Sequence, residues 1–206
     1  MSMKIENLDQ KFEKIYQQLS SEKFLEKKGL SGELPFFIST YNPVQEVEIQ
    51  IIIKRMVNRL QQNDISALEV NLYDLVVELI SDRNLLDKIF KTEQSMDKEK
   101  LFRSLQNVLD VQKYLIPAIV KKIEDEDRRT SSQKKMVMIT GVGEVFPYIR
   151  SHTILNNLQN AIKDRPMIMF FPGEYDGHTL DLFGRMKDDN YYRAFNIANY
   201  STEELK

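Results

Sequence analysis

Three short apolar runs constrain the fold of this chain more than any other feature. They are residues 35–40 (PFFIST), 135–140 (KMVMIT) and 166–171 (PMIMFF). Runs of this length without polar alternation are typical of strands that are covered on both faces. A fourth strand is predicted from Ala67 to Leu72, and helical patterns separate the runs. The sequence therefore predicts an α/β fold with a mostly parallel sheet and flanking helices, either Rossmann-like or like a degenerate P-loop domain.

Local signals give the boundaries of several elements. Residues 4–20 have the apolar spacing of an amphipathic helix. Asn42 is expected to cap a helix that begins at Pro43, because asparagine favours the cap and proline the first helical position. Ser151 is expected to cap another helix. Pro172-Gly173 is expected to end the strand before it, and a final strand is expected from Tyr191 to Ile197.

A long helical segment interrupts the strand pattern. Residues 72–126 contain no glycine and a single proline, Pro117, and their apolar residues recur at helical spacing. We expect three or four helices, with Ser95 capping one that begins at Met96 and Pro117 kinking or restarting the last. Residues 124–133 are expected to be a solvated helix end and linker. The whole chain, 1–206, is thus expected to be one domain with a helical insertion at about 73–130.

Composition excludes several kinds of site. The 206 residues include no cysteine and two histidines, so disulfides, zinc ribbons, iron–sulfur clusters, thiol nucleophiles and three-histidine metal sites are excluded. A net charge of −2 argues against binding to nucleic acid through bulk charge. Two of the first six residues, Lys4 and Glu6, are charged, and no apolar run approaches the roughly 20 residues that a bilayer requires. A cytoplasmic protein without a membrane segment is expected.

Two glycine-containing segments follow predicted strands, where ligands bind in open α/β sheets. These are Gly141-Val142-Gly143 and the segment that starts at Pro172-Gly173. A ligand site between them, for a small molecule or a nucleotide, is one hypothesis. It requires five side chains to converge there, namely Arg150, His152, Asp176, His178 and Arg185.

Each candidate also has a plain structural interpretation. Arg150-Ser151-His152 could bind an anion at a helix N-terminus, or could be a serine cap beside an arginine that pairs with a loop carboxylate. Asp176, His178 and Asp181 could hold a divalent metal, with His178 and Asp181 on one face of a helical turn, but acidic residues beside glycine usually form turns. Tyr191 and Tyr192, near Arg193 and Lys187, could stack on a base, or could pack as ordinary strand residues.

The motifs of common catalytic classes are missing from the sequence. No G-x-x-x-x-G-K-[ST] or G-x-S-x-G motif occurs, and residues 40–43 (TYNP) stand where a phosphate loop would follow the first strand. Proline has no amide hydrogen and tyrosine is bulky, so this turn is unsuited to a triphosphate. The sequence favours a protein that is not an enzyme, and it predicts no cofactor and no metal.

Three stretches, NPVQEVEIQ, ITGVGEVFPYIRSHTILNNL and PMIMFFPGEYDGHTLDLFGRMKDDNYYRAF, resemble the BrxB family of bacteriophage-exclusion (BREX) defence systems. The resemblance covers nearly the whole chain. It implies a small cytoplasmic component that works with a large phosphatase-like PglZ protein, a DNA methyltransferase and an ATPase. It implies no catalytic residues.

From this resemblance we expect an adaptor or assembly factor for the PglZ-like protein. Contact with the methyltransferase or ATPase, contact with nucleic acid only inside a larger complex, and a homodimer remain open. The positions that carry the family signature, and are therefore candidate binding residues, are Gly141, Gly143, Arg150, Ser151, His152, Gly173, Asp176, His178, Arg185, Asp189, Tyr191 and Arg193.

Overall fold

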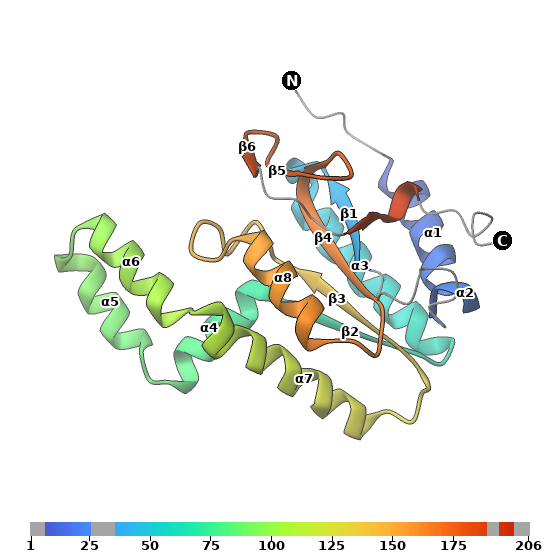
Figure 1. The fold of residues 1–206 in the computed structure, drawn as a ribbon, viewed down its shortest axis with the longest axis horizontal. Helices are drawn as coiled ribbons and strands as arrows, with labels where there is room; N and C mark the ends of the chain where they lie inside the picture. Colours follow the sequence, from blue (N-terminus) through green and yellow to red (C-terminus); the bar gives the residue numbers. More distant parts are fainter. Residues whose placement is uncertain (1–6, 26–35, 189–193, 200–206) are drawn as a thin grey trace.

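A parallel sheet forms the centre of the molecule in the computed structural model, which describes residues 7–25, 36–188 and 194–199 (Figure 1). Its strands run in the order β2-β3-β4-β1-β7, and every pair along this path is parallel. The predicted α/β fold with a mostly parallel sheet is confirmed. The strand bounds are β1 (Phe36–Tyr41), β2 (Ile65–Asn71), β3 (Lys134–Thr140), β4 (Met167–Tyr175) and β7 (Phe195–Asn196).

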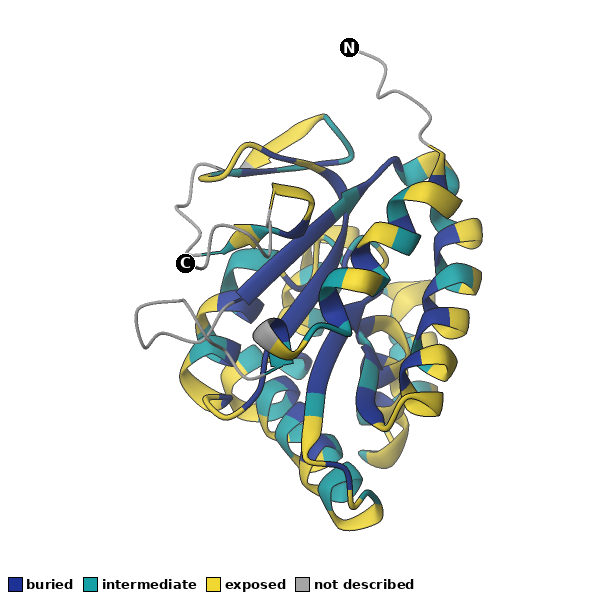
Figure 2. Ribbon diagram, turned by 90° about the vertical axis from the view of Figure 1, so that its right-hand side faces the viewer, coloured by how far each residue is buried: buried dark blue, intermediate teal, exposed yellow. Residues whose placement is uncertain are grey.

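Helices cover both faces of this sheet, as the apolar runs predicted. Successive strand residues point to opposite faces, so Phe36 and Ile38 join one core cluster and Phe37 joins the other. One face is covered by α1 (Leu8–Leu19), α2 (Glu22–Leu25) and α3 (Glu46–Gln62). The other is covered by α4 (Leu72–Asp82), α7 (Ile116–Arg129) and α8 (Ser151–Ala161). Figure 2 shows the buried strands between helices whose outer sides are exposed.

Asparagine side chains begin two of these helical segments. The Asn42 side chain accepts a hydrogen bond from the Val44 amide (3.1 Å) at the start of a 3-10 turn, η1 (Pro43–Gln45), which leads into α3. The predicted cap at Asn42 is confirmed. Asn71 accepts hydrogen bonds from the amides of Tyr73 and Asp74, so β2 ends at Asn71 and Leu72 already belongs to α4.

The segment between β2 and β3 contains α4, α5 (Leu86–Ser95), α6 (Lys98–Val108), the π-helical turn η2 (Val111–Leu115) and α7. The predicted cap at Ser95 is wrong. Ser95 ends α5 and its hydroxyl bonds to the carbonyls of that helix, whereas Asp97 caps α6 by accepting from the Glu99 amide. Pro117 lies in the first turn of α7, as expected for a restarted helix.

Helices α5 and α6 form an arm that projects from the body of the molecule (Figure 1). Neither helix contains a fully buried residue. The arm contacts the rest of the fold partly through Phe102, whose ring centroid lies 5.8 Å from that of Tyr148 in the loop before α8. None of the helices in the described ranges is both long and apolar enough to span a membrane.

Strand β4 runs past the predicted end at Pro172-Gly173. Beyond the parallel sheet it pairs with β5 (Leu180–Leu182) in an antiparallel hairpin, and β5 pairs with β6 (Met186–Asp188). The reason is steric, because a glycine at 173 lets the β5 backbone approach closely. Of the predicted final strand, Phe195 and Asn196 form β7, Ile197 starts the 3-10 turn η3 (Ile197–Asn199), and Tyr191 to Arg193 lie outside the described residues.

The expectation for residues 124–133 is confirmed in part: α7 ends at Arg129, and Arg128 and Arg129 are exposed, but Asp127 ties the end of the helix to the sheet. Arg165, 6% exposed, donates two hydrogen bonds to the carboxylate of Asp127, at 2.9 and 2.7 Å. Lys135 Nζ lies 2.9 Å from the same carboxylate, and Asp164 pairs with Arg165 from the outside. These hydrogen bonds, first the one from Arg165, lower the pKa of Asp127 to about 2.

Candidate functional site

The two glycine-containing segments lie against each other at the carboxyl edge of the sheet. A Cβ atom built on Gly143 would lie 2.8 Å from Cγ of Pro172 and 3.0 Å from the ring of Phe183. Gly141 has a φ of +70°, and a Cβ there would lie 2.6 Å from the capping oxygen of Asn71. The glycines therefore let the loop after β3 pack between the start of α4 and the hairpin after β4.

The turn after β1 cannot cradle a phosphate. Its amides are already used, since Val44 N–H donates to the Asn42 side chain and Gln45 N–H donates to the Asn42 carbonyl. Tyr41 is buried, and its hydroxyl donates to Glu46 at 2.6 Å. Burial, with Glu46 and Glu144 nearby, raises the pKa of Tyr41. The structure thus gives a second reason, beside the missing motif, to exclude a phosphate loop at this position.

A pocket of about 410 Å³ lies between the start of α8 and the β5–β6 hairpin. Its apolar lining comes from Phe146, Phe171, Leu180, Leu182 and Met186. Its polar lining comes from Arg150, Ser151, Arg185 and Lys187. We call this the α8–hairpin pocket. Three of the four polar groups are cationic, so the pocket can attract an anion.

The α8–hairpin pocket brings together only part of the predicted site. Arg150, Ser151 and Arg185 line it, whereas His152, Asp176 and His178 do not. Ser151 is the first residue of α8 rather than its cap, and the Arg150 side chain makes no capping hydrogen bond. His152 follows in the first turn and is half-buried. Asp189, Tyr191 and Arg193 lie outside the described residues.

Asp176 forms a turn, in agreement with its plain structural interpretation. Its carboxylate accepts hydrogen bonds from the amides of His178 (2.8 Å) and Thr179 (2.6 Å) and from the Thr179 hydroxyl. These bonds lower the pKa of Asp176 to about 2. His178 and Asp181 lie in a β-hairpin and not on a helical turn, and the Asp181 side chain accepts from the Met186 amide. In the described ranges, no three histidine or acidic side chains are placed to hold a metal ion.

A second cavity, which sequence reasoning missed, lies beside the end of β2. Its volume is about 490 Å³, and we call it the β2-end cavity. Its lining has four acidic side chains and two lysines, and the Thr140 hydroxyl donates to one of the acidic groups, Glu69, at 2.9 Å. A glutamate in the middle of a strand was the available signal for this cavity. The lining side chains with a charge are Lys54, Glu69, Asp74, Glu78, Lys122 and Glu144.

Glu144 is disfavoured as an anion in the β2-end cavity. Desolvation, followed by the charges of Glu46 and Asp74, raises its pKa above the ordinary 4.5. Because the raised pKa favours the protonated folded state, ionised Glu144 reduces stability at neutral pH. Glu144→Gln is therefore expected to raise the Tm at pH 7, by at most about 2 °C because the residue is exposed. The gain should vanish below pH 4.5.

Thermal unfolding of Glu144→Gln at pH 7 and pH 4 checks this expectation. Glu93→Gln, at an exposed position of α5, is the matched control and should leave the Tm unchanged at both pH values. A lower Tm for Glu144→Gln at pH 7 would show that the Glu144 charge stabilises the fold, contrary to the pKa argument.

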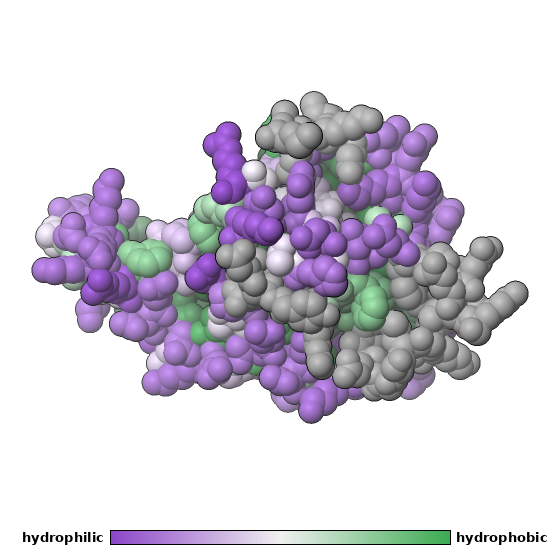
Figure 3. Space-filling model, turned by 45° about the horizontal axis from the view of Figure 1, so that its top comes forward, coloured by the Kyte–Doolittle hydropathy of each residue, from purple (hydrophilic) through white to green (hydrophobic). Residues whose placement is uncertain are grey.

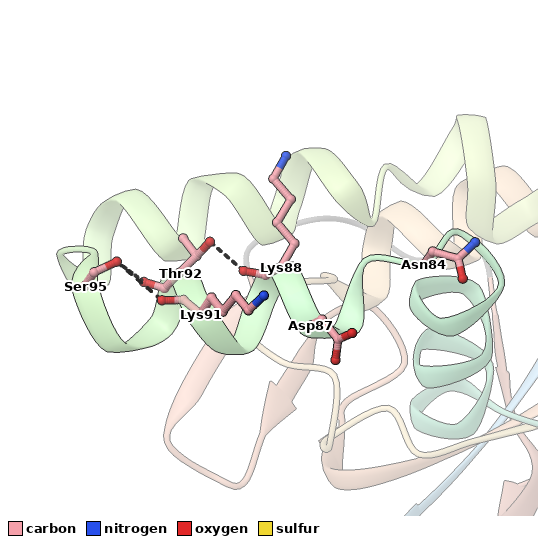
Figure 4. A pocket seen from close by; sticks show the side chains of 6 residues that line it. All are labelled: Asn84, Asp87, Lys88, Lys91, Thr92 and Ser95. Carbon is pink, nitrogen blue, oxygen red and sulfur yellow. Dashed lines mark hydrogen bonds between the residues drawn. The ribbon is translucent and has the colours of Figure 1, made fainter.

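A third hollow, of about 460 Å³, lies along one side of α5 (Figure 4). The Thr92 hydroxyl donates to the Lys88 carbonyl at 2.6 Å, and the Ser95 hydroxyl donates to the Lys91 carbonyl at 3.3 Å. All of its lining comes from α5 and the turn before it. Because no second element encloses the hollow and its hydroxyls are used by the helix, it does not form a binding site.

The fold and its carboxyl edge define a class of protein. It is a three-layer α/β/α protein whose first turn is unsuited to a phosphate and whose carboxyl edge carries one pocket with three cationic side chains and one cavity with four acidic side chains. The chain belongs to the BrxB family. The family described as "BREX protein BrxB" matches residues 68–197, more than half of the chain.

Two relatives are similar over nearly their full length. The BREX protein BrxB of Bacillus cereus (strain H3081.97) is 35% identical over 196 residues, which cover 93% of this chain and 98% of that protein. The BREX protein BrxB of Escherichia coli O9:H4 (strain HS) is 26% identical over 191 residues, which cover 93% and 92%. No solved structure matches the chain. The predicted family is confirmed, and with it a component of a BREX system.

Proposed function

We propose that this chain is a non-enzymatic adaptor of a BREX system and that it docks the PglZ-like protein. Family membership supports the system. The sequence lacks the motifs of common catalytic classes, and its described residues contain no cluster that could hold a metal ion, which supports an adaptor. One observation carries the docking role, namely an apolar stripe on the outer side of α3. The stripe consists of Val44, Val47 and Ile51.

These three residues are 85%, 72% and 48% exposed. They recur at spacings of three and four, so they share one side of the helical segment. The opposite side of α3 is buried against the sheet through Ile49, Ile53 and Met56, which means that the fold does not use the stripe. Figure 3 shows a mostly hydrophilic face with only small hydrophobic patches, so apolar exposure is limited on that side of the molecule.

Contact with a protein partner is more favourable for an exposed apolar stripe than contact with water. Burying one aliphatic side chain stabilises a contact by roughly 1.5–3 kcal/mol. Glu46 and Glu48 lie beside the stripe in the first turn of α3, and the exposed Lys54 and Arg55 lie one turn after Ile51, so the complementary surface on the partner is apolar with side chains of both charges beside it. The partner should therefore bury the stripe and pair with charges at its two ends.

The test is co-expression of the chain with the PglZ-like protein and size-exclusion chromatography of the pair. The unmodified chain is expected to co-elute with its partner. The double variant Val47→Glu/Ile51→Glu should weaken the complex at least about 100-fold, since two buried apolar contacts are lost. Glutamate is a better helix former than valine or isoleucine, so α3 itself should stay intact.

Gln61→Glu is the matched control. It adds one negative charge, against two in the double variant, at an exposed position of α3 about 15 Å beyond Ile51 along the helix axis. This variant should bind like the unmodified chain. Separate elution of the unmodified chain and the PglZ-like protein would overturn the docking role. Equal weakening by Gln61→Glu would show that charge on α3, and not the stripe, decides binding.

A further inference from the structure

We propose that the α8–hairpin pocket binds a small organic phosphate of mononucleotide size. This activity is separate from the adaptor role, because the pocket and the apolar stripe lie on different elements of the fold. Three observations carry the proposal: the unpaired cations at the pocket, its apolar floor, and its volume.

The cations converge from two elements that are distant in sequence. Arg150 directly precedes α8, whereas Arg185 and Lys187 belong to the turn and strand of the hairpin. Within the described part of the chain, no carboxylate forms an ion pair with any of these three side chains, and none lines the pocket. Several arginines elsewhere in the fold do pair with carboxylates, such as Arg59 with Glu13 and Arg165 with Asp127. The three cations are thus available to an anion.

The floor of the pocket suits a flat or apolar body rather than a bare ion. Phe171 and Leu180 are buried core residues, and they fix the base of the pocket from β4 and β5. Phe146 and Met186 add partly exposed apolar surface at its sides. Aromatic and thioether groups of this kind contact the face of a planar ring favourably. A ligand that carries both a ring and a phosphate would use the floor and the cations together.

The volume limits the size of the ligand. A cavity of about 410 Å³ is at the lower end of the range for small-molecule sites, which is about 300–1,000 Å³. Arginine binds phosphate through two parallel hydrogen bonds, so the two arginines among the lining residues suit a phosphate group, and Lys187 adds positive charge beside them. A polynucleotide would need a continuous basic groove, and the α8–hairpin pocket is closed on one side by the hairpin. A mononucleotide is therefore the favoured class.

Isothermal titration of the full chain tests the proposal. The probes are AMP, GMP, CMP and UMP, with adenosine and inorganic phosphate as the two parts of the ligand. At least one mononucleotide is expected to bind, and inorganic phosphate and the free nucleoside should each bind at least about 10-fold more weakly. Arg150→Gln and Arg185→Gln should each weaken mononucleotide binding about 10-fold. Arg129→Gln, an exposed arginine at the end of α7, should bind like the unmodified chain.

Three outcomes would overturn the proposal. The first is no binding of any mononucleotide at millimolar concentration. The second is unchanged binding in both Arg150→Gln and Arg185→Gln while thermal unfolding shows that they are folded. The third is tighter binding of inorganic phosphate or of an oligonucleotide than of every mononucleotide. Because these measurements use the isolated chain, they leave the docking of the PglZ-like protein untouched.

Discussion

Replacing Asp127 with alanine is expected to lower the free energy of unfolding by about 3 kcal/mol, at the lower end of the range for broken buried ion pairs. The substitution leaves the Arg165 guanidinium, 6% exposed, without the carboxylate that accepts two of its hydrogen bonds. Asp164 remains, but it pairs from the solvent side. Urea unfolding at pH 7 measures the loss, and the slope against urea should not change.

Asp125→Ala is the matched control for Asp127→Ala. Asp125 lies in the same helix and pairs with Arg128, but both side chains are well exposed. Such a pair contributes at most about 1 kcal/mol. Equal losses for the two variants would contradict the role given to the Asp127–Arg165 pair. The double variant Asp127→Leu/Arg165→Met should recover most of the stability, because an apolar pair avoids the buried unpaired charge.

The contribution of Asp127 should also depend on pH in a defined direction. Its pKa is about 2 in the folded state against an ordinary value of 3.8, so the unfolded state takes up the proton first as the pH falls. The difference between the unmodified chain and Asp127→Ala should therefore be constant above about pH 5 and shrink as the pH falls toward 2.

Gly173→Ala is expected to destabilise the fold by about 2–4 kcal/mol, above the loss of about 1 kcal/mol at which measured substitutions centre. A Cβ atom at 173 would lie 2.0 Å from the backbone oxygen of Asp181 and 2.9 Å from the ring of Phe171. A backbone atom cannot rotate away, so β4 and β5 must separate at this pair. Urea unfolding measures the loss, and hydrogen exchange should show reduced protection of the Phe183 amide, which bonds to the Pro172 carbonyl.

Gly177→Ala distinguishes this steric effect from the cost of losing a glycine. Gly177 lies in the same hairpin with a φ of +94°, but no atom lies within 4 Å of the position that its Cβ would take. Only the backbone conformation is penalised there, so a loss of about 1 kcal/mol is expected. If Gly177→Ala were as costly as Gly173→Ala, the close approach of Asp181 would not be the reason for a glycine at 173.

The features of the fold that could be predicted from the sequence are those that depend on residues close together along the chain. The apolar runs gave the strands, and Asn42-Pro43 gave the start of a helical segment. The errors have long-range or competing causes. The helix α6 is capped by Asp97, two residues after the predicted cap at Ser95. Strand β4 continues through Pro172 because β5, which follows a turn, pairs with it. Asp127 accepts hydrogen bonds from Arg165, which is 38 residues away, and no local sequence pattern predicts that pair.

The site was predictable only in part for the same reason. Arg150 and Arg185 were proposed to meet, and the hairpin places both at one pocket. Asp176 and His178 were grouped with them because they follow the same strand as Arg185. In the structure the Asp176 carboxylate accepts hydrogen bonds from the amides of His178 and Thr179, within its own turn, and neither residue lines the pocket. Glu69 and Glu144 come from different loops and strands, and only the order of β2 and β3 in the sheet makes them neighbours.

The projecting arm is expected to be less stable against local opening than the rest of the fold. Because α5 and α6 contribute no fully buried side chain, their amides are expected to exchange hydrogen faster than those of the helices that cover the sheet. A spectroscopic label on the arm should therefore perturb the fold least at an exposed position such as Lys91, and more at Leu86, Ile89 or Val108, which pack against the core.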